Sequence, residues 1–136
     1  MRRLILVIFT LSVLCLFHAC KKSDDSNPGN SDSIIGTWEL RISYGGQGGQ
    51  TTYRPGNGTI YNFQAGAYRL FSKGWPIKKG TYKIVRDSSL SGLTDRIVYD
   101  NEYNAIRIFE KVSNNRLLLV IDGFDAPSAE YARISR

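Results

Sequence analysis

The sequence predicts an all-β protein, a single eight-stranded antiparallel up-and-down β-barrel that follows a signal peptide and a flexible tether. Three observations predict this fold. Short runs of β-branched and aromatic residues recur between turn signals made of Gly, Asn, Asp and Pro. No stretch of useful length has the period of an amphipathic helix. The 103 residues from Ile34 to Arg136 suffice for one domain with one hydrophobic core.

The first segment, residues 1–19, is expected to be a signal peptide. Arg2 and Arg3 precede an apolar run from Leu4 to Phe17, which is too short to span a bilayer as an ordinary helix. The run ends in Phe17-His18-Ala19-Cys20, which resembles the lipobox of bacterial lipoproteins. The resemblance implies that Cys20 is lipidated and anchors the chain in a membrane. Phe17 and His18 depart from the usual lipobox residues, so the cleavage position stays open, and a secretory signal with an incidental cysteine is the alternative.

Residues 20–33 are expected to be the lipidated cysteine and a disordered tether. Lys21 to Ser33 contains no apolar residue, and such a segment buries too little to order itself. As a flexible coil it would reach roughly 20 Å. Lys21-Lys22-Ser23-Asp24-Asp25 resembles the tag that sends some Gram-negative lipoproteins to the cell surface, although a plain polar tether is the alternative. We therefore expect a lipid-anchored outer-membrane protein, on the periplasmic or the external face.

Composition argues against most catalytic chemistry. Without residues 1–19 the chain has 117 residues, a net charge of +4, no histidine, and Cys20 as its one cysteine. A Ser-His-Asp triad, a Cys-His pair, a zinc site built on histidine or cysteine, and an internal disulfide are thereby excluded. We expect no enzyme, no catalytic residue, no metal and no cofactor. The modest charge gives no case for nucleic acid, and we expect a monomer.

Strands follow from the alternation of apolar and polar residues. In the first, Trp38, Leu40, Ile42 and Tyr44 are expected to face inward and Glu39, Arg41 and Ser43 outward. Leu117 to Ile121 is apolar throughout, so this strand should be covered on both faces or meet a partner. The eight expected strands are Ile34–Tyr44, Thr59–Phe63, Ala67–Ser72, Gly80–Arg86, Asp95–Tyr99, Ala105–Glu110, Arg116–Ile121 and Ala129–Ser135.

The connections carry turn chemistry. Gln64-Ala65-Gly66 and Ser113-Asn114-Asn115 are expected to form tight hairpins, because Gly and Asn accept positive φ. The connection over residues 45–58 is long enough to be functional or disordered. Closing the meander into a barrel removes its two edges, and eight strands enclose either side chains or one small ligand.

A family resemblance rests on both ends of this domain. Gly36-Thr37-Trp38 is similar to the Gly-x-Trp of lipocalins, and Arg133 lies where their last strand places an arginine across that tryptophan. The resemblance implies that Gly36, Trp38 and Arg133 close one barrel end and that residues 45–58 lid the other. The chain is shorter than secreted lipocalins and lacks their helix and disulfide. It looks more like the compact lipocalin-like domains of bacterial lipoproteins, so ligand binding is implied only weakly.

Several residues are candidates for ligand contact. Tyr131 and Arg133 share a face, and relatives of lipocalins hold a carboxylate with that pair; the alternative is that Trp38 already occupies Arg133. Tyr53, Trp75 and Phe124 are loop aromatics that either pack on the domain or bind a partner. A basic stretch contains Lys73, Lys78, Lys79, Lys83 and Arg86, and it either meets anionic lipid or polysaccharide or serves solubility.

The leading hypothesis is a membrane-anchored protein that binds a small hydrophobic or carbohydrate-like ligand, or a surface glycan, without catalysis. The alternative is a protein-interaction or inhibitor module whose barrel is filled by its own side chains. A continuous interior cavity of about 300 Å³ or more would favour the first, and a packed interior would favour the second.

Overall fold

A computed structural model describes residues 33–45 and 48–136, and within these ranges the chain forms nine strands and no helix. The strands are β1 (Gly36–Gly45), β2 (Gly49–Thr52), β3 (Ile60–Gln64), β4 (Ala67–Ser72), β5 (Trp75–Ser89), β6 (Gly92–Tyr99), β7 (Ile108–Ser113), β8 (Arg116–Ile121) and β9 (Ser128–Ser135).

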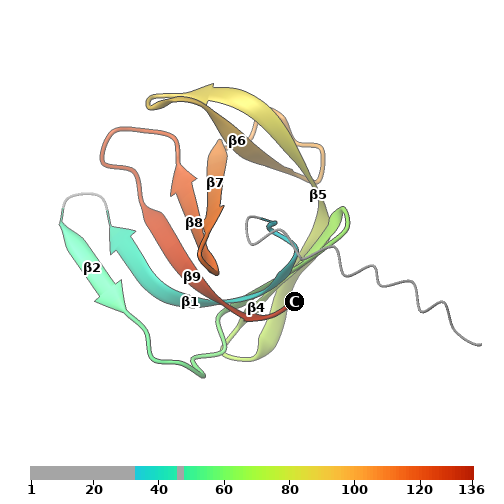
Figure 1. Ribbon diagram of the computed structural model, residues 1–136, viewed down its shortest axis with the longest axis vertical. Coiled ribbons are helices and arrows are strands. Elements are labelled where there is room, and N and C mark those ends of the chain that lie inside the picture. The colour runs from blue at the N-terminus through green and yellow to red at the C-terminus, as the bar shows by residue number, and fades with distance from the viewer. Residues whose placement is uncertain (1–32, 46–47) are drawn as a thin grey trace, which may run out of the picture.

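Eight of these strands form a closed antiparallel barrel (Figure 1). Strands β3 to β8 each pair with the next along the chain, and β1 closes the ring by pairing with β3 on one side and β9 on the other. The predicted eight-stranded up-and-down barrel is thus confirmed. The ninth strand, β2, was not predicted; it pairs with the second half of β1 and extends from the ring as a hairpin (Figure 1).

The long first connection departs most from the prediction. After β2 it turns back along the outer side of β1, where Tyr53 donates its backbone N–H to the carbonyl of Arg41 (2.8 Å). Glu39, expected to face water, is only 4% exposed. Its carboxylate accepts the N–H groups of Gly56 (3.1 Å) and Gly58 (3.3 Å) and a bond from Arg41 (2.7 Å). Alternation placed Glu39 on the correct face, but the chain folds over that face and supplies donors there.

The alternation within β1 also breaks partway. The register with β9 slips by one residue between Leu40 and Ile42, which leaves Arg41 as the extra residue of a β-bulge. After the bulge Ser43, rather than Ile42, lies opposite Ala129. The expected inward face therefore holds through Trp38 and Leu40 and not beyond them.

Other boundaries moved for reasons of turn chemistry. Trp75, expected in a loop, is the first residue of β5, because Lys73 (φ 50°) and Gly74 (φ 83°) form a two-residue turn between β4 and β5. Strand β7 begins at Ile108 rather than Ala105. The two predicted hairpins are confirmed: Gly66 has φ 71°, and Asn114 and Asn115 have φ 49° and 59°.

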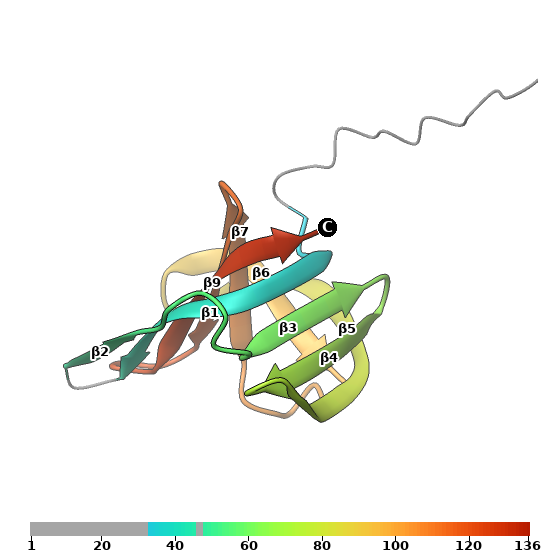
Figure 2. The same ribbon diagram turned by 90° about the horizontal axis from the view of Figure 1, so that it is seen from below.

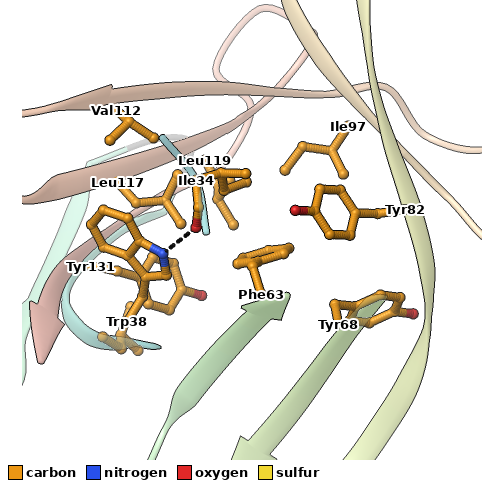
Figure 3. Packing of buried hydrophobic residues seen from close by; sticks show 11 residues of the cluster. Ile34, Trp38, Phe63, Tyr68, Tyr82, Ile97, Val112, Leu117, Leu119 and Tyr131 are labelled. Atoms are coloured by element: carbon orange, nitrogen blue, oxygen red, sulfur yellow. Dashed lines mark hydrogen bonds between the residues drawn. The ribbon is translucent and has the colours of Figure 1, made fainter. Parts of the chain in front are cut away.

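The hydrophobic core lies inside the ring (Figure 3). Of the apolar run in β8, Leu117 and Leu119 belong to this core, whereas Leu118 and Val120 lie on the outer face and are half-buried. The sequence predicted that this strand would be covered on both faces or meet a partner, and its outer face is only partly covered. The buried cluster consists of Ile34, Trp38, Leu40, Phe63, Tyr68, Tyr82, Ile97, Val112, Leu117, Leu119 and Tyr131.

Candidate functional site

An apolar groove of about 500 Å³ lies on the outer side of the barrel, and we call it the outer groove. Its floor comes from β7 and β8, where Phe109 lies opposite Val120 and Lys111 opposite Leu118. One wall is the turn between β5 and β6 with Leu90, and the other is the connection from Asp122 to Asp125. Figure 1 shows that turn close to the connection between β8 and β9.

The floor is apolar because the strands that form it carry apolar residues on both faces. Side chains alternate across a strand, so Phe109 and Val120 point away from the core that Val112 and Leu119 join. The exposed rim residue is Phe124, whose side chain is 91% exposed. A volume of this size, with an apolar lining and a few polar groups, is typical of a small-molecule site.

A charged network fixes the walls of the outer groove. Arg107 donates to the backbone carbonyl of Ser88 (2.9 Å) and forms a hydrogen-bonded ion pair with Asp122. Asp122 in turn accepts the N–H of Leu90 (3.3 Å). The β5–β6 turn is thus joined to the start of the β8–β9 connection. Arg107 and Asp122 therefore fix the two walls relative to each other.

A second arginine, Arg96 of β6, holds the end of β5 that leads into the β5–β6 turn. Arg96 is 7% exposed and donates to Asp87 (3.1 Å) and to the carbonyl of Tyr103 (2.6 Å). Burying a guanidinium is costly unless it is paired and hydrogen-bonded. Its partners therefore hold the β6–β7 connection and the end of β5 against the outer face of β6. The N–H of Ser88, followed by Arg96 and Arg107, lowers the pKa of Asp87, which keeps this partner charged.

Glu110 is the titratable residue of the groove that stands out. Burial, followed by the nearby charge of Asp95, raises the pKa of its carboxyl to about 7. Its Oε2 is buried and has no hydrogen-bond partner among the described residues. The same carboxyl interacts with Tyr82 of the core, and Glu110 lies opposite Leu119 on the inward face of β7. Its carboxyl therefore points toward the barrel interior, although the residue also borders the groove. The protonated form, which can donate a hydrogen bond, therefore persists to higher pH than for an ordinary carboxyl.

The barrel interior is occupied by aromatic rings rather than by an evident ligand space (Figure 3). Phe63 stacks on Tyr61 with centroids 5.2 Å apart and meets Tyr82 edge-on at 5.1 Å. Tyr99 meets Tyr68 at 4.7 Å. Burial, followed by neighbouring tyrosines, raises the pKa of Tyr99 and Tyr131 well above the ordinary value. These hydroxyls therefore remain protonated and serve packing.

Trp38 and Arg133 lie together at one barrel end. The guanidinium of Arg133 is centred 4.0 Å from the Trp38 ring and donates to the carbonyls of Ile35 (2.6 Å) and Ser33 (2.7 Å). The Trp38 indole donates to the carbonyl of Ile34 (2.7 Å; Figure 3). At Gly36, with φ 141°, a Cβ would lie 2.7 Å from the Arg133 side chain. The segment before β1 is thus drawn across the barrel end.

The sequence-predicted contact residues do not gather in one place. Tyr131 is buried in the core, and Arg133 is engaged at the barrel end, which favours the structural role for this pair. Tyr53 packs against the core, with its hydroxyl 3.3 Å from that of Ser43. Trp75 is 77% exposed beside the β4–β5 turn. Of these candidates, Phe124 lines the outer groove.

Other predictions concern residues or features outside this groove. Cys20, with the signal peptide and most of the tether, lies outside the described residues. Within residues 33–45 and 48–136, no group of three or more His, Cys, Asp or Glu side chains is placed to hold a metal ion. The same part of the chain contains no helix with the length and hydropathy needed to cross a bilayer.

Sequence reasoning missed Glu110 and the network around Arg96 and Arg107. One signal was present: the apolar run from Leu117 to Ile121 indicated an outer face that needs cover or a partner. Glu110 lies opposite Asp95 of β6 and Leu119 of β8. These pairings bring together distant parts of the chain, and the alternation of apolar and polar residues does not predict them. Comparison with protein-family models, with curated proteins and with solved structures finds no match to this chain.

Proposed function

We propose that this protein is a lipid-anchored, non-catalytic binding protein whose outer groove holds a small apolar ligand with a hydrogen-bonding head group. The proposal rests on the 500 Å³ groove with an apolar floor and the outward-facing Lys111 in its lining. Leu118, Val120 and Phe124 offer the apolar contacts. Lys111, which faces outward opposite Leu118, offers a head group a charged hydrogen-bond donor.

Ligand binding in the barrel interior has less support than binding in the outer groove. Rings of the core cluster contact one another at centroid distances of 4.7 to 6.5 Å inside the barrel. Eight-stranded barrels can be filled by side chains in this way. We therefore propose the same class of ligand as the sequence suggested, but we place its site on the outer wall and not at the open end of the barrel.

The anchor is a separate part of the proposal and rests on Cys20 and its resemblance to a lipobox. Replacement of Cys20 by Ala should abolish lipidation and release the chain from membranes. If the Cys20→Ala chain still partitions into membranes, the anchor is wrong, whatever the groove binds.

Native mass spectrometry of the full chain tests the groove. After exposure to cell extract and release from detergent, we expect an added mass below about 1 kDa, in keeping with a drug-sized pocket. Val120→Glu places a charge on the apolar floor and should remove the added mass. Ile106→Glu is the matched control, because Ile106 is exposed and does not line the groove.

Two results would contradict ligand binding at this groove. One is the absence of any added small molecule on the unaltered chain, and the other is equal recovery of that molecule by the Val120→Glu chain. The packed interior supports the alternative function, a protein-interaction module. That function would be favoured if the unaltered chain carries no added small molecule but forms stable protein complexes that Val120→Glu disrupts.

A further inference from the structure

One wall of the barrel carries positive charge and no acidic residue. Residues 40–86 contain eight Lys and Arg residues and no Asp or Glu. This span includes β3, β4 and most of β5, which lie side by side (Figure 2). Ion pairs with acids outside the span engage Arg41, Lys78 and Arg86. Among the described residues no ion pair engages the remaining five, which are Arg54, Arg69, Lys73, Lys79 and Lys83.

The strand register concentrates part of this charge in a single row. Thr37, Asn62, Arg69 and Lys79 are successive cross-strand partners on β1, β3, β4 and β5. Their side chains point outward, because the adjacent Phe63 and Tyr68 belong to the core. We call the outer faces of β3, β4 and β5 around this row the cationic wall.

Arg69 and Lys79 are directly opposite each other across β4 and β5, and both are exposed. Like charges in directly opposite positions destabilise a pair of strands. No carboxylate in the span relieves this repulsion. An external anion between the two side chains would relieve it, and the arrangement therefore favours a negatively charged partner.

The surface around Arg69 is hollowed rather than flat. Three shallow grooves of about 350, 430 and 570 Å³ have Arg69 in their lining. Asn62 and Gln64 supply amide groups to two of them, and Phe71 and Ile77 supply apolar surface. Each pair of these grooves shares at least two lining residues, so the three lie next to one another, which suits an extended chain better than a compact ligand.

We propose that the cationic wall binds an acidic polysaccharide, a chain of uronic acid or similar sugars. Its carboxylates pair with Arg69 and Lys79 as charge-assisted hydrogen bonds. Its hydroxyls meet the side chains of Asn62 and Gln64, and its ring faces lie on Phe71 and Ile77. Single-stranded nucleic acid needs successive aromatic platforms for its bases, and the polar amides of this wall suit sugar hydroxyls better.

The test uses the full chain in a nonionic detergent and immobilised polygalacturonate, a polymer of uronic acid. We expect saturable binding that weakens as salt rises, and no binding to neutral dextran. The double variant R69E/K79E should weaken binding at least about tenfold, since it removes two charged donors and adds two charges that repel the polymer. The matched control R116E/R136E makes the same change in net charge on exposed positions elsewhere.

Each remaining outcome overturns part or all of this proposal. Absence of binding to polygalacturonate, or equal loss in both double variants, removes the site. If poly(dT) or micelles containing phosphatidylglycerol compete as strongly as free polygalacturonate at equal charge, the partner is not a polysaccharide. The outer groove has a different lining, so its Val120→Glu variant should bind polygalacturonate as the unaltered chain does. A loss in this variant would place the polymer on the outer groove instead.

Discussion

At the scale of single residues, Arg133 ties together three parts of one barrel end. It covers the Trp38 ring and binds the carbonyls of Ile35 and Ser33 from the segment that precedes β1. A cation over an indole contributes about 0.5–2 kcal/mol. The pair therefore stabilises the fold, and the contact between Trp38 and Arg133 that the sequence analysis expected is present.

Replacing Arg133 by Ala should lower the free energy of unfolding by about 2–4 kcal/mol. The ring contact is lost, and two carbonyls lose a charged donor. Urea unfolding followed by tryptophan fluorescence measures the change. Arg136→Ala removes an exposed terminal charge and should change stability by less than about 0.5 kcal/mol. If both variants lose equally little, Arg133 does not hold the barrel end.

The pKa of Glu110 makes stability depend on pH. Because burial raises this pKa from the ordinary 4.5 to about 7, the folded state holds the proton more tightly than the unfolded chain. The contribution of Glu110 to the free energy of unfolding should therefore fall as pH rises from 4.5 to 7 and stay constant above. Glu110→Gln should remove this slope. Unfolding midpoints at pH 4.5, 5.5 and 7 for both chains measure it, and identical slopes would place the Glu110 carboxyl in water.

At the scale of elements, Glu39 organises the connection between β2 and β3. Burial raises the pKa of its carboxyl, but bonds from Arg41 and from the Gly56 and Gly58 N–H groups more than offset this, so the pKa lies below its ordinary value. The charged form is thus the one that the fold uses, and its contribution to stability is lost as the pH falls through the lowered pKa.

Glu39→Gln should therefore loosen residues 53–59 before it unfolds the barrel. One acceptor becomes a donor that faces the Arg41 guanidinium, and we expect a loss of about 1–3 kcal/mol. Amide hydrogen exchange should accelerate at Gly56 and Gly58 and stay slow in β8. Uniform acceleration over the whole chain, or none at Gly56 and Gly58, would contradict the role given to this carboxylate.

Strand alternation and turn residues were sufficient to predict most of the barrel. Gly66 and the pair Asn114-Asn115 determine their hairpins locally, because few other residues accept positive φ. The bulge at Arg41 and the burial of Glu39 were not predictable in this way, since each depends on a segment far along the chain. For the same reason the sequence indicated Phe124 as a contact residue but not the groove that it borders.

At the scale of the whole molecule, the barrel has a packed core and carries two separate surfaces on its outer side. The outer groove lies over β7 and β8 and is apolar, whereas the cationic wall lies over β3, β4 and β5. The interior of the barrel is packed with aromatic rings, so we propose that ligands bind on its outer surfaces. Variants on either surface should therefore act independently, which makes the two proposals separable.

We propose that an apolar ligand occupies the outer groove and leaves the barrel interior unchanged. Nuclear magnetic resonance of the full chain in detergent, titrated with dodecan-1-ol, tests it most directly. We expect saturable shifts at Leu118, Val120 and Phe124, with the signals of Phe63 and Tyr82 unmoved. Shifts confined to Phe63 and Tyr82 would place the ligand inside the barrel and contradict the claim.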